Sequence, residues 1–301
     1  MATPGFRRRV YFSISAFVGV LTLGFLVAWV VAGQLIAARP QTIGSPPSDL
    51  PAESIVLHSE SGSEIAGWHI PADSSQGVVV LLHGIRGSRL SMLDRARMLY
   101  SEGYSIVMID LQAHGESSGT QITIGHLEKH DARAAVEFAR EQHPAEAVGV
   151  IGVSLGGASA LLASPLGIDA LVIESVYPDI ESAVNNRVAA RIGPLSAIPA
   201  MILLMQIEPR LGIEKSQLRP IDHVSATECP VLIVSGTEDL HTTAAETKRI
   251  FVAAKTPKEL WLIDGAAHVD LLAASPKEYA IRVTQFFKTH FQRKPEALLQ
   301  Q

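Results

Sequence analysis

The chain has 301 residues, of which 47% are hydrophobic and 18% charged, a composition that supports a sizeable core and excludes a disordered protein. Four of its 25 basic residues lie in residues 1–39, where there is no acidic residue, so the rest of the chain holds 21 basic against 30 acidic residues. This acidic remainder has no surplus of basic side chains to neutralise phosphates, which argues against a nucleic-acid partner. The single cysteine, Cys229, excludes an intramolecular disulfide.

Residues 10–38 contain no charge, and the stretch 12–32 is dense in Val, Leu, Phe, Ile and Ala. About 20 apolar residues span a bilayer, so the sequence predicts a transmembrane helix here. Three arginines at 7–9 precede it and only Arg39 follows, which predicts a cytoplasmic N-terminus and a body on the extracytoplasmic side. A cleaved signal peptide is the alternative, because residues 37–38 are small; the length of the apolar stretch favours an uncleaved signal anchor.

The predicted organisation has four parts. Residues 1–39 are the N-terminal transmembrane anchor, and residues 40–52, rich in proline and serine, are a short semi-rigid linker. Residues 53–291 form the folded body, and residues 292–301 form a polar tail.

Short apolar runs alternate with segments of helical character through the body. The runs at 54–58 and 64–70 flank a short loop with glycine and predict a β-hairpin. Six further runs are continuously apolar, as in strands buried on both faces, and lie at 78–82, 106–109, 148–151, 170–173, 231–234 and 260–263. Alternation with helices implies βαβ crossovers, so the sequence predicts an α/β fold: a mostly parallel eight-stranded sheet with flanking helices and an antiparallel pair at its edge.

One interval is too long for a single crossover helix. More than fifty residues separate the runs at 170–173 and 231–234, so about residues 177–222 are predicted to form a helical cap over the sheet. Within the cap, the Met- and Leu-rich run at 198–205 is compatible with lining an acyl-chain pocket, with resting on a membrane, or with filling the core of the cap.

Residues 152–156, Gly-Val-Ser-Leu-Gly, directly follow an apolar run and match the pattern of a nucleophile elbow. In such a turn a strand passes sharply into a helix and presents the hydroxyl, here that of Ser154. Glycine is expected at 152 and 156 because a side chain there would collide with neighbouring segments. Taken alone, the pentapeptide is also compatible with an ordinary tight turn.

A serine nucleophile needs a general base, and the base needs a carboxylate to fix its tautomer. In a sheet of this kind both are expected after the serine, acid first, at the carboxyl ends of later strands. Asp239 follows the run at 231–234 and His268 follows the run at 260–263. The sequence therefore predicts Asp239 as the acid and His268 as the base.

Other groups compete for these roles. Glu238 and Asp264 are the rival acids, for which a structural or solvated role is expected. His241 is the rival base, but it lies only two residues beyond Asp239, which is awkward for reaching the serine. No His-x-x-x-His pair with a third ligand stands out in the sequence, so neither a metal site nor a cofactor is predicted.

The reaction also needs donors for a developing oxyanion. The backbone N–H of Leu155, at the start of a helix, is the first candidate. The second is the N–H of Ile85 in the loop His83-Gly84-Ile85-Arg86-Gly87, where the histidine and glycine are expected to shape the loop.

These motifs, together with Leu82-His83-Gly84 and the stretch Asp110–Ser117, resemble the α/β-hydrolase superfamily. They are most similar to its membrane-anchored branch related to serine aminopeptidases, lysophospholipases and acyl-protein thioesterases, over about residues 53–291. The resemblance implies a serine hydrolase with Ser154 as nucleophile, Asp239 as acid and His268 as base.

The sequence departs from the family pattern at Gln112-Ala113, where an arginine or tyrosine is common. This departure affects the assignment to a subfamily and not the roles of Ser154, Asp239 and His268. Serine at 154, where haloalkane dehalogenases and epoxide hydrolases use a carboxylate, argues against their chemistry.

The resulting expectation is a membrane-anchored enzyme that cleaves an ester or thioester through an acyl-enzyme, on a small-molecule or lipid-like acyl substrate. A peptidase or amidase of the same fold is the alternative, as is a non-catalytic scaffold that retains the fold. An acyltransferase would differ only in the nucleophile admitted for deacylation. Substrate identity and oligomeric state are not determined by the sequence.

Overall fold

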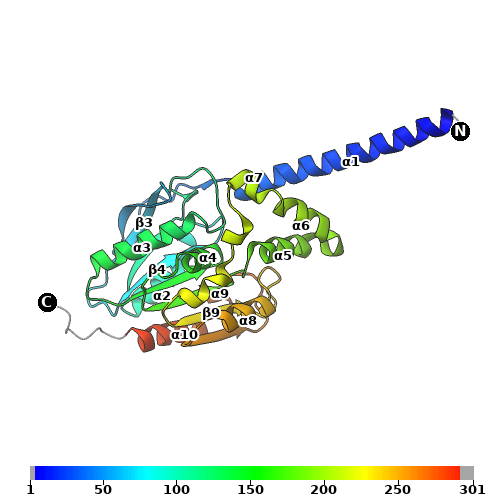
Figure 1. Cartoon of the computed structure of the whole chain (residues 1–301). Coiled ribbons are helices and arrows are strands. Elements are labelled where there is room, and N and C mark those ends of the chain that lie inside the picture. The colour runs from blue at the N-terminus through cyan, green and yellow to red at the C-terminus, as the bar shows by residue number, and fades with distance from the viewer. Residues whose placement is uncertain (1–3, 292–301) are drawn as a thin grey trace.

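The computed structural model describes residues 4–291. The long helix α1 (Pro4–Ile36) projects from an α/β body (Figure 1). The predicted polar tail at 292–301 lies outside the described residues.

The body is built on one eight-stranded sheet, as predicted, with the order β10-β9-β8-β7-β4-β5-β3-β2. The strands are β2 (Glu53–His58), β3 (Glu64–Ile70), β4 (Val78–Leu82), β5 (Ser105–Ile109), β7 (Val148–Val153), β8 (Ala170–Glu174), β9 (Val231–Gly236) and β10 (Lys258–Ile263). The pairs β2–β3 and β3–β5 are antiparallel, and the remaining pairs are parallel. The antiparallel edge is therefore confirmed.

Helices cover both faces of the sheet because the inner strands are apolar on both sides. One face packs against α3 (Glu128–Gln142), α4 (Leu155–Leu162) and α8 (Ala244–Ala253). The other packs against α2 (Leu93–Ser101), the short α9 (Leu271–Ala274) and α10 (Pro276–His290). Short 3-10 turns lie at Arg89–Met92, Gly193–Ser196, Lys215–Gln217, Pro220–Asp222 and Val224–Ala226.

The predicted helical cap lies between β8 and β9. It consists of α5 (Ile180–Ile192), α6 (Ala197–Leu204) and α7 (Ile207–Leu211). Asp179 is the N-cap of α5, and its side chain accepts the N–H of Ser182. The apolar run at 198–205 does not simply fill the core of the cap. Ile198, Met201 and Met205 are exposed, whereas Leu203 lines a cavity described below.

The segment that follows α1 is fastened to the body. The two-residue strand β1 (Arg39–Pro40) pairs with β6 (His114–Gly115), and the N–H of Ile122 donates to the carbonyl of Ile36. Within the predicted linker, the N–H groups of Ile43 and Gly44 donate to the carboxylate of Glu116. The C-terminal end of α1 is thereby positioned beside the cap (Figure 1).

Among residues 4–291, two stretches are long and apolar enough to cross a membrane, Tyr11–Ile36 with a mean hydropathy of 2.4 and Ile180–Leu211 with 1.7. The second is the cap. Its longest helix, α5, has 13 residues and so extends only about 20 Å, short of the roughly 30 Å of a hydrocarbon core. Both ends of the cap return to neighbouring strands of one sheet. The cap is therefore not a spanning segment.

Candidate active site

Ser154 occupies the turn between the end of β7 and the start of α4, with φ 48° and ψ −105°. A positive φ is unusual for a residue with a side chain and is the backbone strain expected of a nucleophile elbow. The two flanking glycines are required sterically, as the sequence indicates. A Cβ on Gly152 would meet the backbone of Gly157, and a Cβ on Gly156 would overlap the carbonyl of Leu82.

Asp239 and His268 are brought together at the carboxyl ends of β9 and β10. The His268 Nδ1 atom lies 2.8 Å from Asp239 Oδ2. The same carboxylate accepts the N–H groups of His241 and Thr242 at 2.8 Å each and the Thr242 hydroxyl at 2.6 Å. Burial would raise the pKa of Asp239, but the hydrogen bonds from His268 and Thr242 outweigh it and lower the pKa to about 2.

This geometry fixes the orientation of the His268 ring. An ionised carboxylate only accepts hydrogen bonds, so Nδ1 of His268 carries the proton and donates it to Asp239. The opposite nitrogen, Nε2, is then an acceptor in the neutral ring.

Ser154 and His268 line the same cavity, which has a volume of about 540 Å³. The Ser154 hydroxyl is buried and forms no hydrogen bond with any residue of the described part of the chain, His268 included. Contacts for proton transfer are often long in the free enzyme and tighten when substrate binds.

The rival acids lie away from this arrangement. Glu238 and Asp264 are exposed, and neither lines the cavity. His241 does line it, and its ring centroid lies 4.9 Å from that of His268. The Asp239 carboxylate, however, binds the imidazole of His268 and only the backbone of His241.

The loop that carries Ile85 is held by two buried histidines. His83 Nδ1 donates to the Gly84 carbonyl, and its Nε2 accepts the N–H of Leu111. Burial lowers the pKa of His83 to about 3, so this ring stays neutral in the required tautomer. His114 accepts the N–H of Arg86 through Nε2.

The N–H groups of Ile85 and Leu155 remain available. Neither donates a hydrogen bond within residues 4–291, and the Leu155 N–H belongs to the first turn of α4, where a helix has no acceptor of its own. Ile85 lines the Ser154 cavity. Two free donors near the hydroxyl are what stabilisation of an oxyanion requires.

An ion-pair network in the wall of the cavity was not foreseen from the sequence. Arg95 pairs with Glu174 at 2.7 Å and with Asp270 at 3.0 Å, and it also contacts the hydroxyl of Tyr279. Because Asp270 lies two residues after His268, this network positions the loop of the histidine. A charged residue at the end of the apolar run Ala-Leu-Val-Ile-Glu, at Glu174, was the one signal available in the sequence.

Comparisons with known proteins agree with the fold. Residues 73–174 match the family model described as serine aminopeptidase, S33. The uncharacterized protein YqkD of Bacillus subtilis is 22% identical over 240 residues, which cover 77% of this chain and 78% of YqkD.

Solved structures extend the likeness over most of the chain. The esterase Pf2001 of Pyrococcus furiosus superposes with a TM-score of 0.70 at 23% identity, covering 85% of this chain and 99% of the esterase. The alpha/beta hydrolase GrgF from Penicillium sp. superposes with a TM-score of 0.64 at 20% identity, covering 80% of this chain and 99% of GrgF. The strand order, the turn at Ser154 and these similarities together show that the chain has the α/β-hydrolase fold.

Proposed function

We propose that this protein is a serine hydrolase that cleaves an ester or thioester bond, with Ser154 as nucleophile, His268 as general base and Asp239 as the acid that orients the base. The observation that carries the proposal is the convergence of a strained serine and a carboxylate-bound histidine on one cavity.

In this mechanism His268 Nε2 takes the proton of the Ser154 hydroxyl as the oxygen attacks the acyl carbon. The N–H groups of Leu155 and Ile85 stabilise the oxyanion of the tetrahedral intermediate. His268 then returns the proton to the leaving oxygen or sulfur, which leaves an acyl-enzyme. A water molecule deprotonated by His268 attacks the acyl-enzyme, and the proton passes back to Ser154.

An aminopeptidase is the second candidate, because the matching family model bears that description. Such an enzyme has to bind the ammonium group of a peptide N-terminus, which favours a free carboxylate in the site. Among described residues, Asp270 is the one carboxylate that faces the Ser154 cavity, and it is paired with Arg95. The cavity therefore favours an ester or thioester over a peptide with a free N-terminus.

Labelling with a fluorophosphonate tests the nucleophile. The wild-type protein is expected to form the covalent adduct, and Ser154→Ala is expected to lose it. Ser175→Ala is the matched control, because Ser175 lines the same cavity and its hydroxyl is also buried without a hydrogen-bond partner among residues 4–291. Labelling that survives Ser154→Ala would refute the assignment, and an unlabelled wild type would favour the scaffold.

We also propose that α1 anchors the protein in a bilayer with the N-terminus in the cytoplasm. Its apolar side chains are largely exposed. Tyr11 and Trp29 stand 18 residues apart on the helix, a rise of about 27 Å, so the two aromatic rings suit the two interfaces of a membrane. The arginines at positions 7–9 precede the first of these rings.

Protease accessibility tests the orientation. Protease added outside intact cells or spheroplasts is expected to digest the body, residues 53–291, and a cytoplasmic marker protein in the same cells should stay intact. Protection of the body until the membrane is lysed would reverse the orientation.

A further inference from the structure

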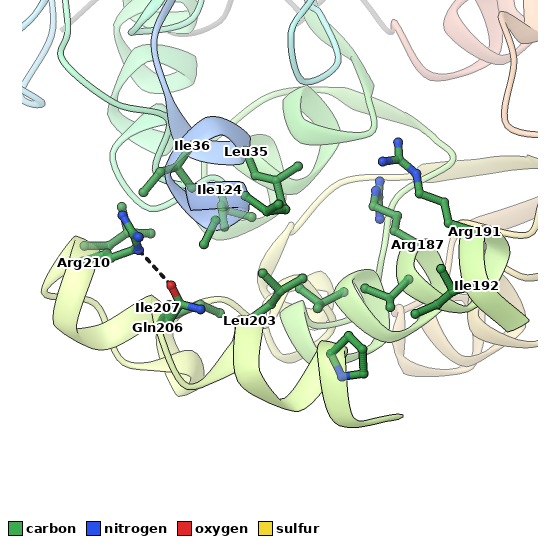
Figure 2. A pocket seen from close by; sticks show the side chains of 16 residues that line it. Leu35, Ile36, Ile124, Arg187, Arg191, Ile192, Leu203, Gln206, Ile207 and Arg210 are labelled. Carbon is green, nitrogen blue, oxygen red and sulfur yellow. Dashed lines mark hydrogen bonds between the residues drawn. The ribbon is translucent and has the colours of Figure 1, made fainter. Parts of the chain in front are cut away.

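A second cavity adjoins that of Ser154. It has a volume of about 310 Å³ and lies between the C-terminal end of α1 and the cap helices α5, α6 and α7 (Figure 2). Its lining is mainly aliphatic, and six residues line both cavities: Leu35, Ile36, Ile124, Val184, Arg187 and Arg191. An apolar chain attached to a group at Ser154 can therefore extend into the space beside α1.

Arginines stand where the two cavities meet. Arg187 and Arg191 lie about one turn apart on α5, and both line the two cavities (Figure 2). Arg86, from the loop that carries Ile85, lines the Ser154 cavity as well. Within residues 4–291, none of the three forms an ion pair with a carboxylate within 4 Å.

The two carboxylates whose charges act on Arg187 already accept hydrogen bonds from other groups. Burial lowers the pKa of Arg187 although Tyr177, Asp239 and Glu246 oppose this effect. The Asp239 carboxylate accepts hydrogen bonds from His268 and Thr242, as described above. The Glu246 carboxylate accepts hydrogen bonds from the side-chain amide of Asn186 and from the backbone N–H of Thr243. The positive charge of Arg187 is therefore not neutralised by a direct partner.

Like charges crowd the same region. Burial lowers the pKa of Arg86, and so do the neighbouring charges of Arg39 and Arg191. Arg39 and Arg86 both donate to the carbonyl of Gln34 in the last turn of α1, a position where a positive charge stabilises a helix. Hydrogen bonding to the last turn of α1 explains in part why Arg39 and Arg86 are found here. Arg191 has no such partner among the described residues, and Arg187 donates only to the carbonyl of Ala183 on its own helix.

We propose that Arg187 and Arg191, together with Arg86, bind a negatively charged phosphate or carboxylate group of the substrate while its alkyl chain occupies the cavity beside α1. The substrate class is then an anionic, single-chain acyl ester or thioester. Uncompensated arginines in a protein whose body is acidic are stabilised by such a group, and guanidinium groups bind phosphate and carboxylate through paired hydrogen bonds. The proposal rests on the proposed function for the reaction at Ser154 and concerns the groups that hold the substrate there.

The test uses the full chain in detergent micelles and measures how ligands slow fluorophosphonate labelling of Ser154. Octyl phosphate and octanol differ by one phosphate, and neither can be hydrolysed at an acyl bond. Octyl phosphate is expected to protect at a concentration at least tenfold lower than octanol. The double variant Arg187→Gln/Arg191→Gln is expected to abolish this difference, whereas Arg282→Gln, which replaces an exposed arginine on α10, should preserve it.

Two further measurements test the phosphate group and the alkyl chain of the ligand separately. Inorganic phosphate should protect far less than octyl phosphate, and Leu203→Trp, which fills the cavity beside α1, should weaken octyl phosphate but not inorganic phosphate. Equal protection by both phosphates would assign the site to a small free anion and overturn the substrate class. Equal protection by octyl phosphate and octanol would overturn the anion site.

Thermal unfolding of Ser154→Ala with the same ligands repeats the comparison without the nucleophile. A larger rise in Tm with octyl phosphate than with octanol would support the anion site even if labelling at Ser154 failed, and equal rises would refute it. A long-chain monoacylglycerol phosphate in nanodiscs is then compared with its short-chain, water-soluble analogue. This comparison distinguishes a membrane lipid from a soluble substrate. Preference for the nanodisc form assigns the membrane as source.

Discussion

Replacement of His268 by alanine is expected to lower kcat for hydrolysis of an activated acyl ester by about four to six orders of magnitude. Without the imidazole, no group that contacts Asp239 can take the proton of Ser154, and the serine hydroxyl is a weak nucleophile on its own near neutral pH. The residual rate is then set by the oxyanion donors and by substrate binding. The measurement is kcat with a p-nitrophenyl ester, with Tm recorded to show that the variant is folded.

His241→Ala is the matched control for this experiment. His241 lies in the same cavity, and its ring is 4.9 Å from that of His268, but Asp239 contacts only its backbone N–H. A loss of less than tenfold is expected. A large loss from His241→Ala with a small loss from His268→Ala would transfer the role of base to His241.

The positions of Ser154, Asp239 and His268 could be predicted because each follows an apolar run, and parallel strands deliver their carboxyl ends to one edge of a sheet. The eight strands followed from the same runs. The side-chain contacts that join these elements could not be predicted from the spacing of residues in the sequence. The Arg95 network joins residues from α2, β8 and the loop after β10, which are brought together only by the packing of the complete sheet.

His241 shows why loop geometry escapes a sequence argument. Its short separation from Asp239 in the sequence predicts only that it would reach the serine awkwardly. The structure shows that Asp239 Oδ1 accepts the N–H groups of both His241 and Thr242, which turns the loop back on itself. The His241 ring consequently lies beside His268.

The sequence predicts that α1 is an apolar helix but not where its C-terminal end packs against the body. Composition predicts an apolar helix at 12–32, yet it does not reveal that the turns ending at Ile36 form one wall of a cavity. That follows from the strand pairing of Arg39–Pro40 with His114–Gly115 and from Arg210, whose guanidinium stacks 3.8 Å from the centre of the Trp29 ring. Both contacts join segments that are distant in the chain.

Asp239→Asn is expected to lower kcat by about three to four orders of magnitude while the fold is retained. The carboxylate accepts four hydrogen bonds in the structure, whereas an amide presents an NH₂ group that cannot accept. If this NH₂ group faces His268, Nδ1 must become the acceptor and Nε2 must carry the proton. The ring then cannot take the proton of Ser154.

The pKa of Asp239 gives the same variant a pH signature. The folded-state pKa of about 2 lies below the usual value near 3.9 of an unfolded chain, so the carboxylate contributes on the order of 2 kcal/mol of stability that is present above pH 4 and lost as the pH falls towards 2. Asp239→Asn should lack this acid-dependent loss. Unfolding measured between pH 2.5 and pH 6 compares the two proteins. An Asp239→Asn enzyme with more than a tenth of the wild-type kcat would contradict the assignment. The same assay on Glu238→Gln and Asp264→Asn would then locate the acid, because these two residues are the rival acids in the sequence.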